Sequence, residues 1–159
     1  MRSTRLFPAL ALLALVPAAA LAAQPIDGHY QANGKDGKLA YLLAQKGEAF
    51  HDMPTDVLIF SEKDASHDAD PVADARKGDL GDALVVTVVQ APWGWDTLSG
   101  YLYHAGLSDT HRADTAGVIK LKDAAVANGE IHGHLVTDAG EKVGDQRIDI
   151  DLKFQAKLP

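Results

Sequence analysis

Two histidines and a carboxylate alternate along one short segment, where they could bind a metal ion. Glu130, His132 and His134 lie two residues apart, so on a β-strand all three side chains point to the same face. Imidazole and carboxylate groups are common ligands of zinc, copper and other first-row metals. A further ligand would have to come from elsewhere in the chain, and the candidates are His29, His104 and Asp138. The alternative is a solvent-exposed strand face that happens to carry two histidines. We favour this alternative, because the spacing alone does not supply the convergent third ligand that a metal site needs.

Both tryptophans of the chain lie in one short segment with a turn sequence. Trp93 and Trp95 flank Gly94, which lets a loop bend sharply. Turn-borne tryptophans offer flat, rigid area for stacking on sugars or for anchoring a protein partner. The alternative is that the indoles fold back and plug an open end of the domain. Tyr101 and Tyr103 follow on the next predicted strand and complete the candidate ligand- or partner-binding set, unless they form the edge of the core.

An acidic run from 64 to 70 places oxygen-bearing side chains at alternate positions, as in the first half of a calcium-binding loop. The similarity then ends. Ala69 stands where the loop requires glycine, and Ala75 stands where a bidentate glutamate should close it. We therefore expect a solvated acidic loop.

The chain shows no signature of a catalytic site. It has no cysteine, no Gly-x-Ser-x-Gly and no glycine-rich phosphate loop. The serine, histidine and aspartate between 108 and 114 are adjacent in sequence and lack a nucleophile elbow. We expect a non-enzymatic binding or inhibitory module without a cofactor, which acts through loops on a β-sandwich, namely the Trp93–Trp95 loop and the acidic insertion. The alternative is a metal-binding periplasmic protein that uses Glu130, His132 and His134, and a hydrolase with an unrecognised carboxylate site ranks third.

The first residues have the pattern of a secretory signal peptide. Arg2 and Arg5 precede an uncharged run that ends in Ala20-Leu21-Ala22, a basic start and a small-residue cleavage site. A retained membrane anchor is the alternative. We predict a signal peptide over 1–22 and an exported domain over 23–159, periplasmic or secreted, with no membrane span after cleavage.

The net negative charge of the chain argues against some classes of binding partner. The formal net charge is −7 at pH 7 and becomes −9 once Arg2 and Arg5 leave with the leader. An acidic surface without a basic stripe argues against nucleic acid. The partners that we expect are a protein or a carbohydrate of the cell envelope.

A hydrophobic period of two dominates the chain after the leader, which is the pattern of half-buried strands. It predicts an all-β fold, a single antiparallel β-sandwich of about eight strands, immunoglobulin-like or a partly open barrel. The predicted strands are 26–32, 39–45, 57–60, 84–89, 98–105, 118–122, 130–137 and 147–154.

One long connection, 61–82, does not follow this period. Asp70 before Pro71 is typical of a helix start, and Gly78 after Arg76-Lys77 is typical of a helix end. We expect one short helix there.

Two segments carry a family resemblance. The opening 28–35 (GHYQANGK), with Leu39-Ala40-Tyr41 after it, and the segment 57–64 (VLIFSEKD) resemble small exported bacterial β-sandwich-like proteins of unassigned function. The resemblance implies an exported β-sandwich-like domain, and it carries over no catalytic residue.

Overall fold

In the part of the chain that the structure describes, alternating apolar residues form eleven strands, and one helix lies between the fourth and the fifth of them. The structure is a computed structural model that describes residues 26–108 and 110–159. The predicted signal peptide, 1–22, lies outside the described residues. The elements are β1 (Ile26–Ala32), β2 (Lys35–Asp36), β3 (Tyr41–Lys46), β4 (Thr55–Ser61), α1 (Pro71–Lys77), β5 (Ala83–Ala91), β6 (Gly94–Tyr103), β7 (Arg112–Asp114), β8 (Lys120–Ala127), β9 (Glu130–Val136), β10 (Lys142–Val143) and β11 (Gln146–Lys157). Within the described residues, no helix is long and apolar enough to cross a membrane.

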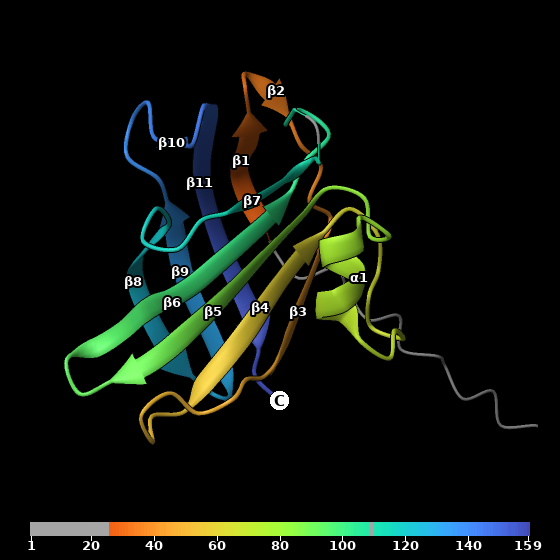
Figure 1. Cartoon of the computed structure of the whole chain (residues 1–159). Helices are drawn as coiled ribbons and strands as arrows, with labels where there is room; N and C mark the ends of the chain where they lie inside the picture. The colour runs from red at the N-terminus through yellow and green to blue at the C-terminus, as the bar shows by residue number, and fades with distance from the viewer. Residues whose placement is uncertain (1–25, 109) are drawn as a thin grey trace, which may run out of the picture.

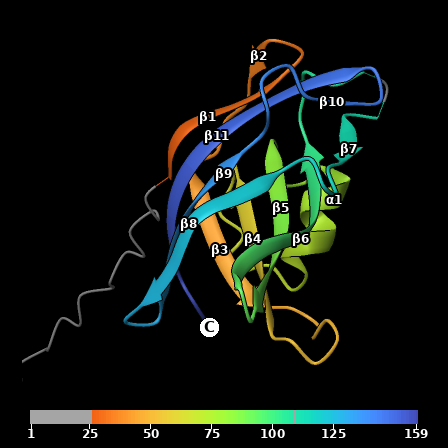
Figure 2. The same ribbon diagram turned by 90° about the vertical axis from the view of Figure 1, so that its left-hand side faces the viewer.

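The strands form two antiparallel sheets that pack face to face (Figures 1 and 2). The first sheet has the order β2-β1-β11-β9-β8, with β10 paired to β11, and the second sheet has the order β3-β4-β5-β6-β7. The prediction of an all-β, sandwich-like fold is confirmed.

The main core lies between the two sheets. Leu58 and Phe60 of β4 face Ile150, Leu152 and Phe154 of β11 in one buried cluster. The rings of Phe60 and Phe154 meet edge to face, with centroids 5.5 Å apart, a preferred geometry for aromatic pairs. The alternation in β11 therefore buries one face of the strand and leaves the other in solvent, as its sequence predicts.

The outer face of the second sheet has a smaller core of its own beneath α1. Ile59 and Val85 point outward from the sheet and pack against Ala75 of the helix. This explains why β4 and β5 are apolar on both faces. The helix begins and ends where the sequence predicts, because Asp70 accepts a hydrogen bond from the Ala73 amide and Gly78 closes the last turn in the left-handed region.

The strand count is the part of the fold prediction that was wrong: the described residues form eleven strands, and about eight were expected. The additional strands are β2, β7 and β10, which have two, three and two residues. Segments of this length are too short to show a hydrophobic period.

A β-bulge in β6 decides which side chains face outward from the second sheet. Thr87 of β5 pairs with Ser99, whereas its neighbour Val88 pairs with Thr97, so Leu98 is an extra residue on β6. A bulge of this kind shifts the alternation of the strand by one residue. Trp95 therefore packs against the main core, although strict alternation would place it on the same face as Ser99 and Tyr101.

Candidate binding groove on the outer face of the second sheet

A groove of about 710 Å³ crosses the outer face of the second sheet. Its floor is a row of paired residues on four neighbouring strands: Gln45 opposite Val57, Val57 opposite Thr87, and Thr87 opposite Ser99. Each side chain points away from the main core because it alternates with core residues of its strand. Leu98, the bulged residue, also lines the groove, so the bulge adds an apolar side chain to this otherwise mostly polar row.

The helix forms one wall of the groove. Val72 and Arg76 of α1 line it together with Tyr101 of β6. The guanidinium carbon of Arg76 lies 5.4 Å from the centroid of the Tyr101 ring, within the range of a cation–π interaction. The Tyr101 hydroxyl donates to the carbonyl oxygen of Arg76 at 3.2 Å. These two contacts attach the wall to the floor.

The loop between β3 and β4 forms the opposite wall, through residues 47–50. It turns back at His51 and Asp52, which have φ values of 47° and 64°. Two consecutive left-handed residues are the requirement of a type I′ turn, where asparagine and glycine are preferred. Phe50 and Met53 close the turn with two backbone hydrogen bonds of 3.0 and 2.9 Å. The turn leaves Phe50 39% exposed at the rim of the groove.

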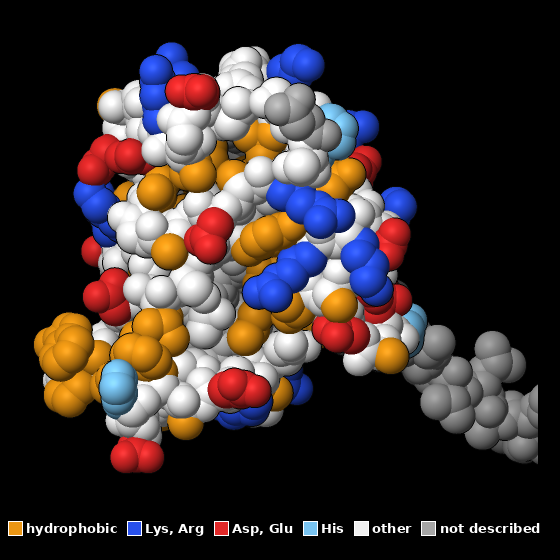
Figure 3. Space-filling view, viewed as in Figure 1, with side chains coloured by type: hydrophobic (Ala, Val, Ile, Leu, Met, Phe, Trp, Pro, Cys, Tyr) orange, Lys and Arg blue, Asp and Glu red, His pale blue; other side chains and the backbone are white. Residues whose placement is uncertain are grey.

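The charges around the groove balance. Two cations, Lys46 and Arg76, and two carboxylates, Glu48 and Asp114, line it. Lys46 also forms an ion pair of 2.9 Å with the buried Asp56 carboxylate. On the face of the second sheet, apolar side chains lie between basic and acidic ones (Figure 3).

The four residues of the predicted ligand- or partner-binding set do not form one surface. Trp93 is 77% exposed at the tip of the β5–β6 hairpin, where Figure 3 shows an apolar cluster at the end of the molecule. Trp95 is half-buried against the main core. Tyr103 packs in the small core beneath α1, and Tyr101 alone of the four lines the groove.

The predicted metal-binding residues lie on β9, at the outer face of the first sheet. Glu130 and His134 each contact a different neighbour on β11. The Glu130 carboxylate accepts a hydrogen bond from the Gln155 amide at 2.6 Å, and His134 Nε2 lies 2.8 Å from an Asp151 oxygen. This contact with His134 is the main reason that the pKa of Asp151 lies below its usual value. His132 is exposed on the same strand. Within the described residues, no three histidine, cysteine, aspartate or glutamate side chains converge as metal ligands.

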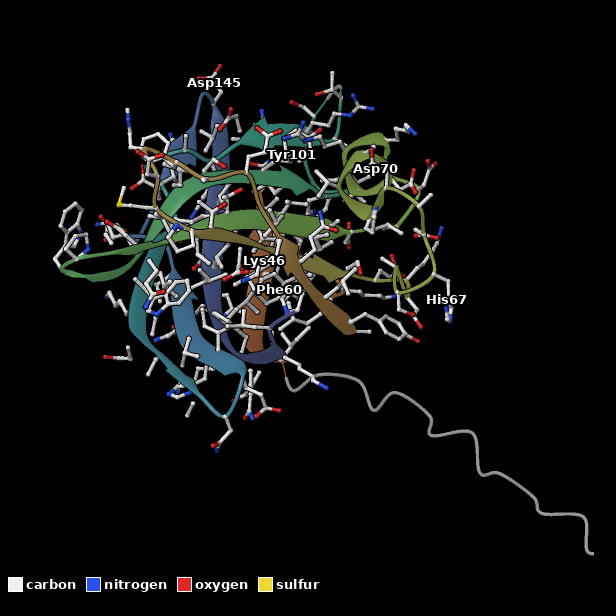
Figure 4. All side chains as sticks on the ribbon, turned by 90° about the horizontal axis from the view of Figure 1, so that it is seen from below. Lys46, Phe60, His67, Asp70, Tyr101 and Asp145 are labelled. Atoms are coloured by element: carbon white, nitrogen blue, oxygen red, sulfur yellow. The ribbon has the colours of Figure 1, made fainter. Side chains whose placement is uncertain are left out.

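The acidic segment before α1 is likewise held by local contacts. Asp64 accepts a hydrogen bond from the Ser66 amide at 2.9 Å, and this bond lowers the pKa of Asp64. Asp70 caps the helix. His67 projects away from the body of the domain (Figure 4).

His104, one of the candidate further ligands, is buried at the end of β6 with 1% exposure. Its Nδ1 accepts a hydrogen bond from the Gly106 amide at 2.7 Å, which places the ring proton on Nε2. The imidazole lies 4.9 Å from the Tyr30 ring, and Nε2 makes no hydrogen bond within the described residues. Burial lowers the pKa of His104, although Asp82 and the nearby Tyr30 carbonyl act in the opposite direction.

The groove was not predicted from the sequence, because its floor depends on the register between strands that are far apart in the chain. The local signal was the presence of Gln45, Thr87 and Ser99 within otherwise apolar strand segments. Comparison with protein-family models, with curated proteins and with solved structures finds no match. The function proposed below is therefore argued from the geometry of this chain.

Proposed function

We propose that this protein is a non-enzymatic binding module whose ligand lies in the groove across the outer face of the second sheet. The observation that carries the proposal is the groove itself. Its volume of about 710 Å³ falls within the range of about 300–1,000 Å³ that is typical of ligand sites. We further propose that the module acts outside the cytoplasm, as the basic, apolar and Ala-x-Ala pattern of residues 1–22 indicates.

Two local irregularities support a binding role at this place. The bulge at Leu98 adds a side chain to the groove, and bulges are frequent next to functional sites. The turn at His51 and Asp52 keeps two residues other than glycine at positive φ. These φ values are what a type I′ turn requires, and the turn sets the position of the loop wall. Both irregularities border the same groove, on opposite sides of its floor.

We also propose that the sandwich is best described as a partly open barrel. Contacts join β3 to β11 and β6 to β8, so the two sheets approach each other along both sides. The outer face of the second sheet is left as a curved surface, on which α1 and the β3–β4 loop stand as walls.

A fragment screen by two-dimensional ¹H–¹⁵N NMR tests this proposal without requiring that the natural ligand be known. Small polar and aromatic fragments should shift the amide resonances of Gln45, Val57 and Tyr101 in the wild-type protein. Thr87→Trp places an indole on the groove floor and should abolish these shifts. Gln155→Trp places the same side chain on the exposed outer face of the first sheet and should preserve them. Fragments that bind elsewhere, or that bind equally well to both variants, would contradict the proposal. The spectra themselves report whether each variant is folded.

A further inference from the structure

The floor of the groove is formed by side chains of paired strands. We infer that the ligand of this groove is a neutral oligosaccharide, and this inference rests on the proposed function. Two floor strands, β4 and β5, are hydrogen-bonded to neighbours on both sides. An extended peptide that binds by strand addition needs an unpaired sheet edge. The edge strand β3 borders the floor on one side, and across β4 and β5 recognition falls to side chains.

The side chains on the floor are suited to hydroxyl groups. Gln45 offers an amide donor and acceptor, and Thr87 and Ser99 each offer a hydroxyl that both donates and accepts. None of these three side chains is hydrogen-bonded to another described residue. They lie in one row across the sheet. A row of uncommitted neutral donors and acceptors matches a ligand that carries hydroxyls along its length.

The charge balance argues against an ionic ligand. Lys46 is paired with Asp56, and Arg76 covers the Tyr101 ring. The carboxylates of Glu48 and Asp114 also line the groove and would repel a phosphate or an acidic polymer. With Lys46 paired to Asp56, the carboxylates of Glu48 and Asp114 outnumber the remaining cation, so the groove disfavours an anion. Arg76 in turn repels a cation, and a neutral ligand meets neither cost.

Aromatic rings stand at both walls. Tyr101 lines the groove from the helix side, and Phe50 lines it from the loop side. The faces of aromatic rings give flat apolar contact area, against which the C–H faces of a sugar ring can pack. Arg76 covers one face of the Tyr101 ring, so the exposed Phe50 ring is the main apolar surface for a sugar. The polar floor matches the hydroxyl edges of the same short sugar chain.

The test is isothermal titration calorimetry of the wild-type protein with a panel of soluble probes. The panel contains neutral gluco-, xylo- and N-acetylgluco-oligosaccharides, an oligogalacturonate of the same length as an anionic counterpart, and a short extended peptide. We expect binding of a neutral member, with an affinity that changes little between low and high salt because no ion pair forms. Preferential binding of the oligogalacturonate or the peptide would overturn the inference.

Two conservative variants link binding to the floor. Thr87→Val keeps the shape of the side chain and removes its hydroxyl, and Gln45→Ala removes the amide. Each should weaken binding of the neutral oligosaccharide about fivefold, which corresponds to the loss of one hydrogen bond of about 1 kcal/mol. Gln155→Ala on the first sheet should leave the affinity unchanged.

Two negative results distinguish this inference from the proposed function. If fragments occupy the groove in the NMR screen and no neutral oligosaccharide binds, the inference fails and the groove remains the proposed site. If fragments do not occupy the groove, the proposed function fails. Affinity that is unchanged in Thr87→Val and Gln45→Ala would also overturn the inference.

Discussion

The guanidinium carbon of Arg76 lies 5.4 Å from the centroid of the Tyr101 ring, and the Tyr101 hydroxyl donates to the carbonyl oxygen of Arg76 at 3.2 Å. The two residues thus contact each other twice, once through a side chain and once through the backbone. Because Arg76 belongs to α1 and Tyr101 to β6, the pair fixes the helix against the sheet. The helix wall of the groove is held by this contact together with the apolar packing of Ala75 against Ile59 and Val85.

Arg76→Ala should therefore lower the free energy of unfolding by about 0.5–1 kcal/mol, the usual size of an exposed cation–π contact. Lys77→Ala is the matched control on the next residue. Among the described residues, Lys77 pairs only with Asp74 of its own helix, at 3.3 Å, and such a pair contributes about 0.3–0.5 kcal/mol. Urea denaturation measures both changes. A larger loss in Lys77→Ala than in Arg76→Ala would contradict the role of the Arg76–Tyr101 pair.

The end of α1 gives a second prediction. Gly78 has a φ of 87°, and a Cβ there would lie 2.3 Å from the Tyr103 ring. Gly78→Ala should cost about 1 kcal/mol for the left-handed backbone and about 1–3 kcal/mol more for displacing the ring. Gly117 has a φ of 75° with open space around it, so Gly117→Ala should show the backbone cost alone. Equal losses in the two variants, measured by urea denaturation, would show that Tyr103 adjusts freely.

The two tryptophans should differ sharply in their contribution to stability. Trp95→Ala removes a half-buried indole from the main core and should cost about 2–3 kcal/mol, below the value for a fully buried ring. Trp93→Ala changes a side chain that is 77% exposed and should cost less than about 0.5 kcal/mol. Emission spectra of the two single variants provide a second measurement, because the indole left in Trp95→Ala should emit at longer wavelength than the one left in Trp93→Ala. The reverse order in either measurement would contradict the bulged register of β6.

Buried His104 predicts a loss of stability at mildly acid pH. Its pKa in the folded protein is held below the usual value, chiefly by burial, whereas in the unfolded chain it is about 6.5. As the pH falls below about 6.5, the unfolded chain takes up a proton that the folded protein does not, and the free energy of unfolding decreases. The limiting slope for one proton is about 1.4 kcal/mol per pH unit.

His104→Asn tests this origin of the pH dependence. Asparagine has no titrating group and can still accept the hydrogen bond that the Gly106 amide donates to His104 Nδ1. Urea denaturation between pH 7.5 and pH 5 should give a flatter stability profile for the variant than for the wild type. The same slope in both proteins would assign the effect to other groups.

The parts of the fold that sequence reasoning predicted well are those encoded locally. Asp70 and Gly78 mark the ends of α1 because capping requires particular residue types at particular positions. The alternation from Ile148 to Phe154 identifies the inner face of β11 for a similar reason.

The parts that were not predicted depend on pairing between distant segments. The bulge at Leu98 is visible only in the register between β5 and β6, yet it turns Trp95 inward and Leu98 toward the groove. Gln45, Thr87 and Ser99 come from three separate strands and form a row only once those strands are aligned. The sequence drew attention to Trp93 and Trp95 because they are conspicuous residue types, whereas the floor of the groove consists of ordinary ones.

Intermolecular nuclear Overhauser effects can show directly whether a bound ligand lies in the groove. The ligand is the tightest-binding member of the calorimetry panel, whatever its class. We predict effects from ligand protons to the Tyr101 ring and to the methyl groups of Val57 and Thr87, all of which line the groove. Effects confined to the Trp93 indole, or to residues of the first sheet such as His132, would contradict this prediction.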